Sequence, residues 1–373
     1  MGIQDLYPTL KEHCDGTMNV VKLESLKGLR VSVDVSIFLY KFIKTTDPGK
    51  WINFFIRMFC IFAKNKIDVI CIFDGHNCPD EKKEEQSRRR AGANKNISKL
   101  KVYEEALDKL QIEYVENNCV TVTDQEFLKE VHQLSETQSN NAYQLKLELS
   151  TVVKKLEKQT APITKEHSQM AKEILEILGV PCYQADGEAE GLCAFLAKTG
   201  VVDAVLSEDT DVLAYGTPFF LSKLDLKTEE VMLTAFQDLL TSMNFTEEQF
   251  RDMCILLGCD YNERVKGLPP TKLCTKHATH THYKNTTSIG SKSAVCMIDV
   301  YKSLDAIEPH LIDGDKLNYK RCREIFEMKD IGDIDPSFYT FERKPIQVER
   351  LTEFLKVNNV YLQKSYILKS FEK

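Results

Sequence analysis

Two pairs of carboxylates stand close together in the segment ADGEAEGLCAFLAKTGVVDAVLSEDTDVLAYG, residues 185–216. One residue separates Glu188 from Glu190, and one separates Asp209 from Asp211, which closely follow an apolar run. Charged side chains are rarely kept inside a protein unless they are paired or bind a metal ion. The spacing therefore raises the question of what these four carboxylates hold.

Three further acidic residues occur at comparable places. Asp34 follows LRVSV, Asp74 follows IDVICIF, and Asp260 lies in CILLGCDY. In an open parallel α/β sheet the site lies beyond the carboxyl ends of the strands, so residues that follow different strands meet at one edge. A single acidic residue after a strand is more often a helix cap or a solvated turn. Its recurrence at four predicted strand ends favours a shared site.

Seven carboxylates in one cleft would repel one another unless cations neutralise them. Oxygen ligands without a neighbouring Cys or His are typical of Mg²⁺ or Mn²⁺ rather than Zn²⁺. Two such ions about 4 Å apart serve in-line displacement at phosphorus, because they activate water and stabilise the leaving oxygen. The pattern therefore indicates metal-assisted hydrolysis of phosphate esters.

Alternating strands and helices are predicted around these residues. LRVSVDVSIFLYKF begins as a strand and becomes helical after Asp34, WINFFIRMFCIFAKN is an amphipathic helix, and IDVICIFDG is a buried strand. SQMAKEILEILG is a helix capped by Gly179, VPCYQA and VVDAVLSED are strands, and EAEGLCAFLAKTG is a helix. This order predicts an α/β fold with a mostly parallel central sheet flanked by helices.

Two regions depart from that alternation. The segment from about Glu84 to Ala161 is polar and helical in propensity, which indicates a solvated helical insertion or a partly disordered arm, looser around SETQSNNAYQ. From Phe236 onward the chain is again helical, with an interruption at GLPPTKLCTKHATHTHYKNTTSIG.

The composition is that of a soluble globular protein of one large or two ordinary domains, with 373 residues, 43% hydrophobic and 28% charged. No apolar run approaches a membrane span, and MGIQDLYPTLKE lacks a signal pattern. Twelve scattered cysteines without a CxxC pair indicate a reducing compartment. The net charge is −7, yet basic patches occur at Lys82–Arg90 and at 264–298, where six Lys/Arg and no acids stand. Local patches of this kind suit nucleic acid.

The motifs together resemble the flap endonucleases of the xeroderma-pigmentosum-G superfamily of 5′ nucleases. The similar segments are MGIQDLYPTL, VDVSIFLYKF, FFIRMFCIFAKNKIDVICIFDG, ITKEHSQMAKEILEILGVPCYQA, the 185–216 segment and CILLGCDYNERVKG, in the family's order and over most of the chain. The resemblance implies a PIN-like 5′-nuclease core with a helical arch insertion and a helix–hairpin–helix DNA-binding element. It also implies two Mg²⁺ ions, replaceable by Mn²⁺, at seven acidic ligands: Asp34, Asp74, Glu188, Glu190, Asp209, Asp211 and Asp260.

The resemblance implies further contacts with DNA. Lys82 and Arg89 match the basic catalytic pair that bonds the scissile phosphate, and an extra residue after Asp74 leaves Lys83, Arg88 and Arg90 as alternatives. Tyr40 matches a tyrosine that stacks on a base, and Gly2 matches the buried N-terminus near the active site. IGSKSAVCMIDVYKSL resembles the second half of a helix–hairpin–helix. The resemblance implies that Gly290, Ser291 and Lys292 hold a duplex phosphate together with a K⁺ ion.

The chain departs from the family pattern in three respects. Asp74 and Glu188 are 114 positions apart, which implies an enlarged arch. LPPTKLCTKHATHTHYKNTTS splits the hairpin between Gly267 and Ile289. A polar, basic loop lying on DNA is the favoured interpretation of this insertion, and a zinc cluster of Cys274, His277, His280 and His282 is the alternative. The C-terminal QKSYILKSFEK lacks the paired aromatics of a sliding-clamp peptide.

The resemblance divides the chain into five regions: a nuclease region 1–84, an enlarged arch 85–165, an internal nuclease region 166–259, a split helix–hairpin–helix 260–310 and a C-terminal helical region 311–373. The expected function is a metal-dependent, structure-specific 5′ nuclease on 5′ flaps or branched DNA in replication, repair or recombination. A 5′→3′ exonuclease, a junction resolvase and an mRNA endonuclease share this chemistry. A non-catalytic DNA-bridging protein is the alternative of another class, but such a protein would have lost acids. We expect a monomer in the nucleus or another intracellular site of DNA replication.

Overall fold

The computed structural model describes residues 2–77, 79–117, 125–134, 141–266, 289–311, 313–329, 331 and 334–372. The chain forms two compact units. The core unit comprises Met1–Leu39, Ile52–Glu85 and Lys165–Lys373, and the inserted unit comprises Tyr40–Trp51 and Gln86–Thr164. Within the described ranges, none of the helices combines the length and apolar character that crossing a lipid bilayer requires.

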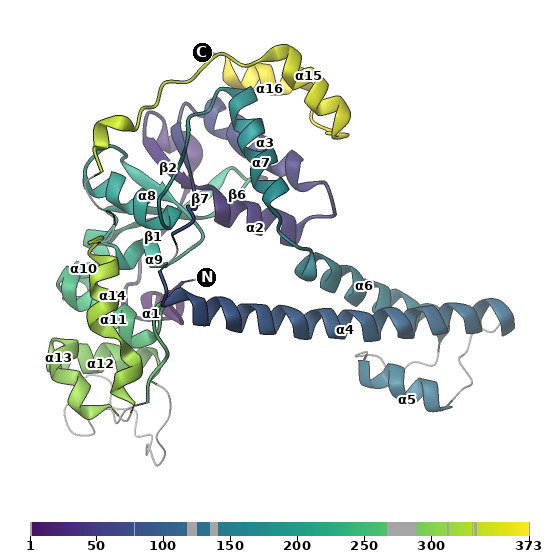
Figure 1. Ribbon diagram of the computed structural model, residues 1–373, viewed down its shortest axis with the longest axis horizontal. Coiled ribbons are helices and arrows are strands. Elements are labelled where there is room, and N and C mark those ends of the chain that lie inside the picture. Colours follow the sequence, from purple (N-terminus) through teal and green to yellow (C-terminus); the bar gives the residue numbers. More distant parts are fainter. Residues whose placement is uncertain are drawn as a thin grey trace. The chain divides into compact units, whose positions relative to one another are not determined.

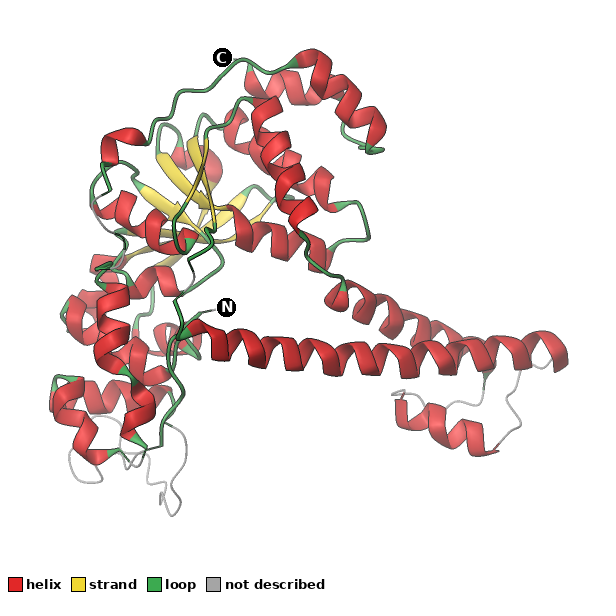
Figure 2. Cartoon of the chain, viewed as in Figure 1, coloured by secondary structure: helices red, strands yellow, loops and turns green. Residues whose placement is uncertain are grey.

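A seven-stranded sheet forms the centre of the core unit; its strands are yellow in Figure 2. The strand order is β1-β7-β6-β5-β2-β3-β4. The pairs β5/β6, β2/β5, β2/β3 and β3/β4 are parallel, whereas β6/β7 and β1/β7 are antiparallel. The predicted mostly parallel α/β sheet is therefore confirmed, and its antiparallel edge is an addition that the sequence did not predict. The strands are β1 Met18–Lys22, β2 Arg30–Asp34, β3 Asp68–Phe73, β4 Cys182–Gln184, β5 Ala204–Leu206, β6 Phe219–Asp225 and β7 Glu230–Ala235.

Helices account for most of the remaining core unit (Figure 1). Two of them, α2 Val35–Thr45 and α4 Lys82–Asn117, begin in the core unit and continue into the inserted unit. The others are α1 Leu6–His13, α3 Trp51–Lys64, α7 Lys165–Leu178, α8 Ala189–Lys198, α9 Asp211–Ala214, α10 Phe236–Met243, α11 Glu247–Leu257, α12 Ser291–Tyr301, α13 Leu304–Ile307, α14 Tyr319–Phe326, α15 Val348–Val357 and α16 Lys364–Phe371.

The central strands are buried along almost their whole length. In β2 the residues from Val31 to Asp34 are all buried, and in β3 the residues from Val69 to Phe73 are. Parallel strands covered on both faces need such continuous apolar runs, which explains why IDVICIF predicts its strand correctly. The charged Asp34 at the end of β2 is the exception in this apolar setting.

A glycine ends α7, as the sequence predicts. Gly179 has a φ of +68°, and a Cβ at this position would lie 1.9 Å from the carbonyl oxygen of Lys344. The Lys344 amide donates a hydrogen bond to the Gly179 carbonyl at 3.0 Å, so the C-terminal segment lies directly against this turn. Only glycine allows both the left-handed backbone and the close approach.

The inserted unit has a small hydrophobic core of its own. It contains most of α4, α5 Gln125–Leu134 and α6 Ala142–Thr160, so the described part of this polar segment is helical as predicted. The core residues are Ala106, Leu110, Leu128, Val131, Ala142, Leu145 and Leu149. Residues 118–124 and 135–140, which include most of SETQSNNAYQ, lie outside the described ranges.

Residues Tyr40–Trp51 belong to this unit as well, which the sequence did not predict. Lys44 donates hydrogen bonds to the carbonyl oxygens of Gln159 and Ala161 at 2.8 and 2.7 Å. Asp47 forms an ion pair of 2.8 Å with Lys158. The end of α2 is therefore tied to the end of α6 by polar contacts between residues more than a hundred positions apart.

Candidate active site

The acidic residues that follow β2 and β3 lie side by side at one edge of the sheet. Asp34 is the last residue of β2 and is paired in register with Ile72, two residues before Asp74. β5 and β4 run parallel to these strands, and they are followed by Asp209 and Glu188 respectively. The predicted gathering of acids at the carboxyl ends of four parallel strands is confirmed by this topology.

Hydrogen bonds hold the first two carboxylates in place. The Asp34 carboxylate accepts from the Ser207 hydroxyl at 2.9 Å and from the Ile37 amide at 3.3 Å. Asp74 accepts from the amide of Ala189 at 2.9 Å. Because Ala189 is the first residue of α8, this carboxylate caps the helix whose first turn carries Glu190. Asp74 thereby links the end of β3 to the acidic pair at the start of α8.

Asp209 and Asp211 are fully buried in the turn that follows β5. Asp209 accepts from the Asp211 amide at 3.0 Å, and its own amide donates to Ser207 Oγ at 3.0 Å. Both carboxylate oxygens of Asp211 are buried and accept no hydrogen bond from the described residues. Burying a carboxylate without partners is costly, so this side chain fits a site that binds a cation.

The seven acids influence one another electrostatically. Burial, and next the charge of Asp74, raise the pKa of Asp34 to about 8. Burial and then Asp209 and Asp260 raise the pKa of Asp211 well above its ordinary value. Burial also raises the pKa of Glu190 well above its ordinary value, with Lys82 opposing and Glu188 adding to the shift. Carboxylates that repel one another in this way are the arrangement that a divalent cation stabilises.

Lys82, the first residue of α4, brings positive charge into this cluster. Its ammonium contacts Glu188 Oε1 and lies 3.5 Å from Glu190 Oε1 and 3.4 Å from Asp260 Oδ2. The Lys82 side chain is only 12% exposed. The structure thus places one of the two predicted phosphate-binding cations directly among the predicted metal ligands.

Two tyrosines and a serine belong to the site although the sequence did not single them out. The Tyr261 hydroxyl donates to Glu188 Oε2, and the Tyr215 hydroxyl lies 3.2 Å from that of Tyr261. Both rings are buried and pack edge-on against Phe326. Ser207 bridges Asp34 and Asp209, as described above. The sequence signal of these roles is their position near the acidic motifs: Tyr261 in CDY, Ser207 in LSED and Tyr215 in DTDVLAYG.

The ligand chemistry needs one correction. The sequence-based expectation is that no cysteine lies nearby, yet Cys259 lies close enough to act electrostatically on Asp211, and Asp34 lies close enough to act on Cys193. Burial raises the pKa of both thiols well above the ordinary value, and the Cys259 thiol donates to Asn262 Oδ1 at 3.1 Å. Both groups are therefore neutral thiols rather than thiolate ligands, and the hard oxygen donors that fit Mg²⁺ remain.

Gly2 lies against the acidic turn after β5, near the site as expected, but it is half-buried rather than buried. Its φ is +84°, and a Cβ there would lie 2.0 Å from Asp209 Oδ1 and 2.8 Å from the Asp211 amide nitrogen. A side chain at this position would have to displace the Asp209 carboxylate. The close approach of the chain's start to the site therefore requires glycine.

The other predicted DNA contacts lie on different parts of the chain. Tyr40 is in the inserted unit and is 44% exposed, with the Lys44 ammonium 5.7 Å from its ring centre. Arg88, Arg89 and Arg90 also belong to the inserted unit, where they follow one another on α4, and only Arg89 is half-buried. Lys83 is 71% exposed and pairs with Asp80 at 2.6 Å.

The expected duplex-binding turn lies at the start of α12. Gly290 is the N-cap of this helix, and Ser291 and Lys292 form its first turn. Lys292 is 63% exposed and lies 3.3 Å from Glu12. Residues 267–288 lie outside the described ranges, and with them the alternative zinc ligands Cys274, His277, His280 and His282.

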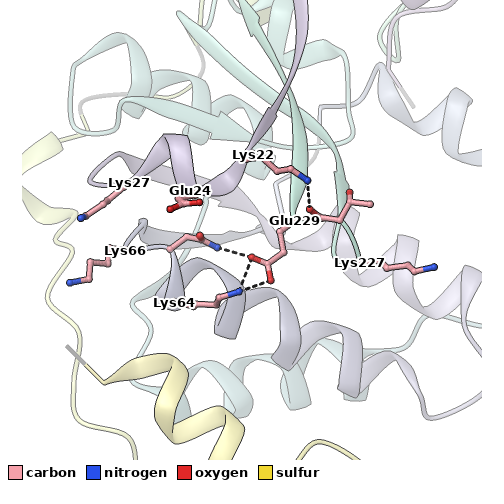
Figure 3. A pocket seen from close by; sticks show the side chains of 9 residues that line it. Lys22, Glu24, Lys27, Lys64, Lys66, Lys227 and Glu229 are labelled. Carbon is pink, nitrogen blue, oxygen red and sulfur yellow. Dashed lines mark hydrogen bonds and ion pairs between the residues drawn. The ribbon is translucent and has the colours of Figure 1, made fainter.

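A pocket with a volume of about 470 Å³ lies at the opposite end of the parallel strands, before the start of β2 and β3 (Figure 3). Lys64 and Asn65 bond to Glu229 there, and Lys22 forms an ion pair of 2.8 Å with Glu230. Lys64 therefore ties the β6–β7 turn to the end of α3, and Lys22 ties the end of β1 to the start of β7. The lining contains none of the seven acids: Lys22, Glu24, Lys27, Lys64, Asn65, Lys66, Lys227, Thr228 and Glu229.

Comparison with known proteins gives matches along the whole chain. Residues 1–96 match the XPG N-terminal domain and residues 179–260 match the XPG I-region. The chain is 30% identical over 393 residues to flap endonuclease 1 of Entamoeba histolytica, an alignment that covers 100% of this chain and 87% of that protein.

Solved structures share the fold. The chain resembles the catalytic core of Rad2 in complex with a DNA substrate, with a TM-score of 0.62, 17% identity and 100% of both chains covered. It also resembles flap endonuclease-1 from Methanococcus jannaschii, with a TM-score of 0.58, 19% identity and 95% and 94% of the two chains covered.

Proposed function

Because this chain belongs to the flap endonuclease family of XPG-type nucleases, we propose that its seven clustered carboxylates bind the catalytic divalent cations. The protein is a structure-specific 5′ nuclease that acts on DNA flaps or branches. The buried carboxylate of Asp211, which accepts no hydrogen bond from the described residues, is the observation that carries the proposal, since burial and the charges of Asp209 and Asp260 raise its pKa well above the ordinary value.

The proposed ligands are the seven acids that the sequence singled out, and the proposed ions are two Mg²⁺, with Mn²⁺ as a substitute. Such ions supply a nucleophilic hydroxide at neutral pH and stabilise the leaving oxygen. The chain's own residues fix the ligands: the Ser207 hydroxyl donates to the Asp34 carboxylate and accepts from the Asp209 amide, and the Tyr261 hydroxyl orients Glu188. Orientation of ligands by such neighbours commonly governs metal affinity and rate.

We further propose how the DNA is held. Lys82 and Arg89 neutralise the phosphate being cut, with Lys83, Arg88 and Arg90 as alternative partners on α4. Tyr40 stacks on a base, and Gly2 lines the cleft next to Asp209. The start of α12, with Gly290, Ser291 and Lys292, holds a phosphate of the duplex together with a K⁺ ion.

The cellular setting follows from this activity. We propose an intracellular, nuclear protein that acts as a monomer in replication, repair or recombination. The nine cysteines that the structure describes are all free thiols, which fits a reducing compartment. The regions 1–84, 85–165, 166–259, 260–310 and 311–373 remain our proposed functional division of the chain.

The test is a panel of labelled DNA flaps, nicks, gaps, four-way junctions and RNA, incubated with Mg²⁺ and mapped at the product ends. We expect cleavage of flaps near the branch, its loss with EDTA, and its loss in the Asp211→Asn variant. Release of nucleotides from plain 5′ ends would identify a 5′→3′ exonuclease. Symmetric nicking of four-way junctions would identify a junction resolvase, and cleavage of RNA would identify an mRNA endonuclease. Binding without cleavage of any member would identify a non-catalytic DNA-bridging protein.

A further inference from the structure

The Lys82 ammonium occupies a position that the proposed chemistry assigns to a metal ion. It contacts Glu188 and lies within 3.5 Å of Glu190 and 3.4 Å of Asp260, and its side chain is 12% exposed. The neighbouring Lys83 is the natural comparison, because it is 71% exposed and pairs with Asp80, which is itself 84% exposed. Two adjacent lysines at the start of one helix therefore lie in opposite environments.

The charge state of Lys82 is that of a cation. Burial alone would lower the pKa of this lysine, but Glu190, Glu188 and Asp260 outweigh burial and hold the pKa well above its ordinary value. The ammonium therefore donates hydrogen bonds and positive charge to the same carboxylate oxygens that a divalent cation would use. Within the described ranges, no group of three or more Asp, Glu, His or Cys side chains has the geometry of a ready-made metal site.

An ammonium and a divalent cation cannot share these oxygens, because two positive charges a few ångströms apart repel each other strongly in a water-poor site. We propose that Lys82 is a resident counter-ion that competes with divalent cations for Glu188, Glu190 and Asp260 and must leave them before metal binds there. This inference rests on the proposed function of these carboxylates as metal ligands.

The position of Lys82 in the chain suggests what draws it away. Lys82 is the first residue of α4, the helix that continues through Arg88–Arg90 to Asn117. A DNA phosphate is a strong anionic partner for an ammonium, and phosphates arrive only with the substrate. Entry of DNA then exchanges the partner of Lys82 and frees the carboxylates, so that substrate binding and metal binding assist each other.

The experiment measures Mn²⁺ affinity of the DNA-free protein by electron paramagnetic resonance of the free ion. We compare wild type, Lys82→Met, which keeps a flexible side chain of similar length without the charge, and Lys83→Met as the matched control. We expect Lys82→Met to bind Mn²⁺ roughly tenfold more tightly than wild type, which corresponds to about 1.4 kcal/mol, and Lys83→Met to bind as wild type does. Adding a flap substrate with Ca²⁺ in place of Mg²⁺ should tighten Ca²⁺ binding to wild type more than to Lys82→Met.

Equal or weaker Mn²⁺ binding by Lys82→Met would overturn the inference while leaving the proposed function intact, provided that wild type binds Mn²⁺. Failure of all three proteins to bind Mn²⁺ at millimolar concentration would overturn both. A second measurement uses wild type alone and does not depend on how a variant folds. Acylation of lysines, read by mass spectrometry, should label Lys82 weakly in EDTA and more strongly in Mn²⁺, with Lys83 labelled equally in both. Labelling of Lys82 that does not respond to Mn²⁺ would also overturn the inference.

Discussion

Replacing Tyr261 by Phe tests whether the site depends on the hydrogen bond that orients Glu188. The Tyr261 hydroxyl donates to Glu188 Oε2, while Lys82 contacts the other oxygen of the same carboxylate. The Tyr261 ring is 2% exposed and packs edge-on against Phe326, with ring centres 5.5 Å apart. Phenylalanine keeps this packing and removes only the hydroxyl, so the change isolates the hydrogen bond.

The expected size follows from the charge of the acceptor. A hydrogen bond to a charged group contributes about 1.5–3 kcal/mol net, which corresponds to roughly a ten- to hundredfold change in an equilibrium or rate constant. Loss of an orienting partner of a metal ligand has a similar effect on metal affinity. The Tyr215 hydroxyl, 3.2 Å from that of Tyr261, makes a neutral contact one step further away. Tyr215→Phe should therefore lower the metal affinity or the cleavage rate by only about two- to tenfold.

The assay is single-turnover cleavage of a flap substrate over a range of Mg²⁺ concentrations. Tyr261→Phe should raise the Mg²⁺ concentration for half-maximal rate, or lower the maximal rate, by the expected factor, with the affinity for DNA in Ca²⁺ unchanged. Thermal unfolding in EDTA checks that the variant is folded. If Tyr261→Phe cleaves with the wild-type rate and Mg²⁺ dependence, or if Tyr215→Phe is the more damaged of the two, the orienting role assigned to Tyr261 is wrong.

Three further outcomes can be checked with single substitutions. Gly2→Ala should lower the cleavage rate roughly a hundredfold, because its Cβ would displace the Asp209 carboxylate by about an ångström, and an unchanged rate would show that the start of the chain is not fixed there. Arg323→Met should lower the free energy of unfolding in denaturant by about 3–5 kcal/mol, since it leaves the buried Asp252, now bonded at 2.6 and 2.7 Å, without its counter-charge; a loss below 1 kcal/mol would contradict this. In EDTA, the pKa of Asp34 in the folded protein is raised to about 8, whereas the unfolded chain releases this proton near pH 4. Because the folded protein therefore binds more protons in this range, the free energy of unfolding should fall from about pH 4 to pH 8. Asp34→Asn should flatten that fall, and an identical pH profile of the two proteins would refute the reasoning.

The parts of the site that could be predicted from the sequence are those with a local signature. Asp34 and Asp74 each end an apolar run, and a run of buried residues followed by an acid fixes both the strand and the edge at which the acid lies. Gly179 was predictable for the same reason, because a glycine after a helical period marks a left-handed cap. These features need no knowledge of contacts between distant residues.

The missed features depend on such distant contacts. Tyr261 is hydrogen-bonded to Glu188, 73 positions away in the sequence, and Ser207 is hydrogen-bonded to Asp34, 173 positions away. The residue types alone do not predict these partners. The β6–β7 hairpin escaped for a local reason. Its register shifts between Ser222 and Asp225, and Lys223 in between has a φ of +52°, so the alternation that identifies a strand is interrupted.

The burial of acids in this protein works against its own stability, and this conflict is informative. The Asp211 carboxylate accepts no hydrogen bond from the described residues, and its pKa is raised by burial and by Asp209 and Asp260. The Lys82 ammonium carries one positive charge and cannot by itself neutralise seven carboxylates. Exceptions to the rule that charged side chains stay exposed occur most often at functional sites. Such a cluster of buried acids persists because binding of the ligand offsets the unfavourable burial. Any ligand that binds only the folded chain stabilises it by mass action, and metal ions should therefore raise the unfolding temperature of this protein. The increase in unfolding temperature should depend on the repulsion among the carboxylates that the metal ions relieve. It should therefore be smaller in the Asp211→Asn variant, which removes charge without changing the shape of the turn.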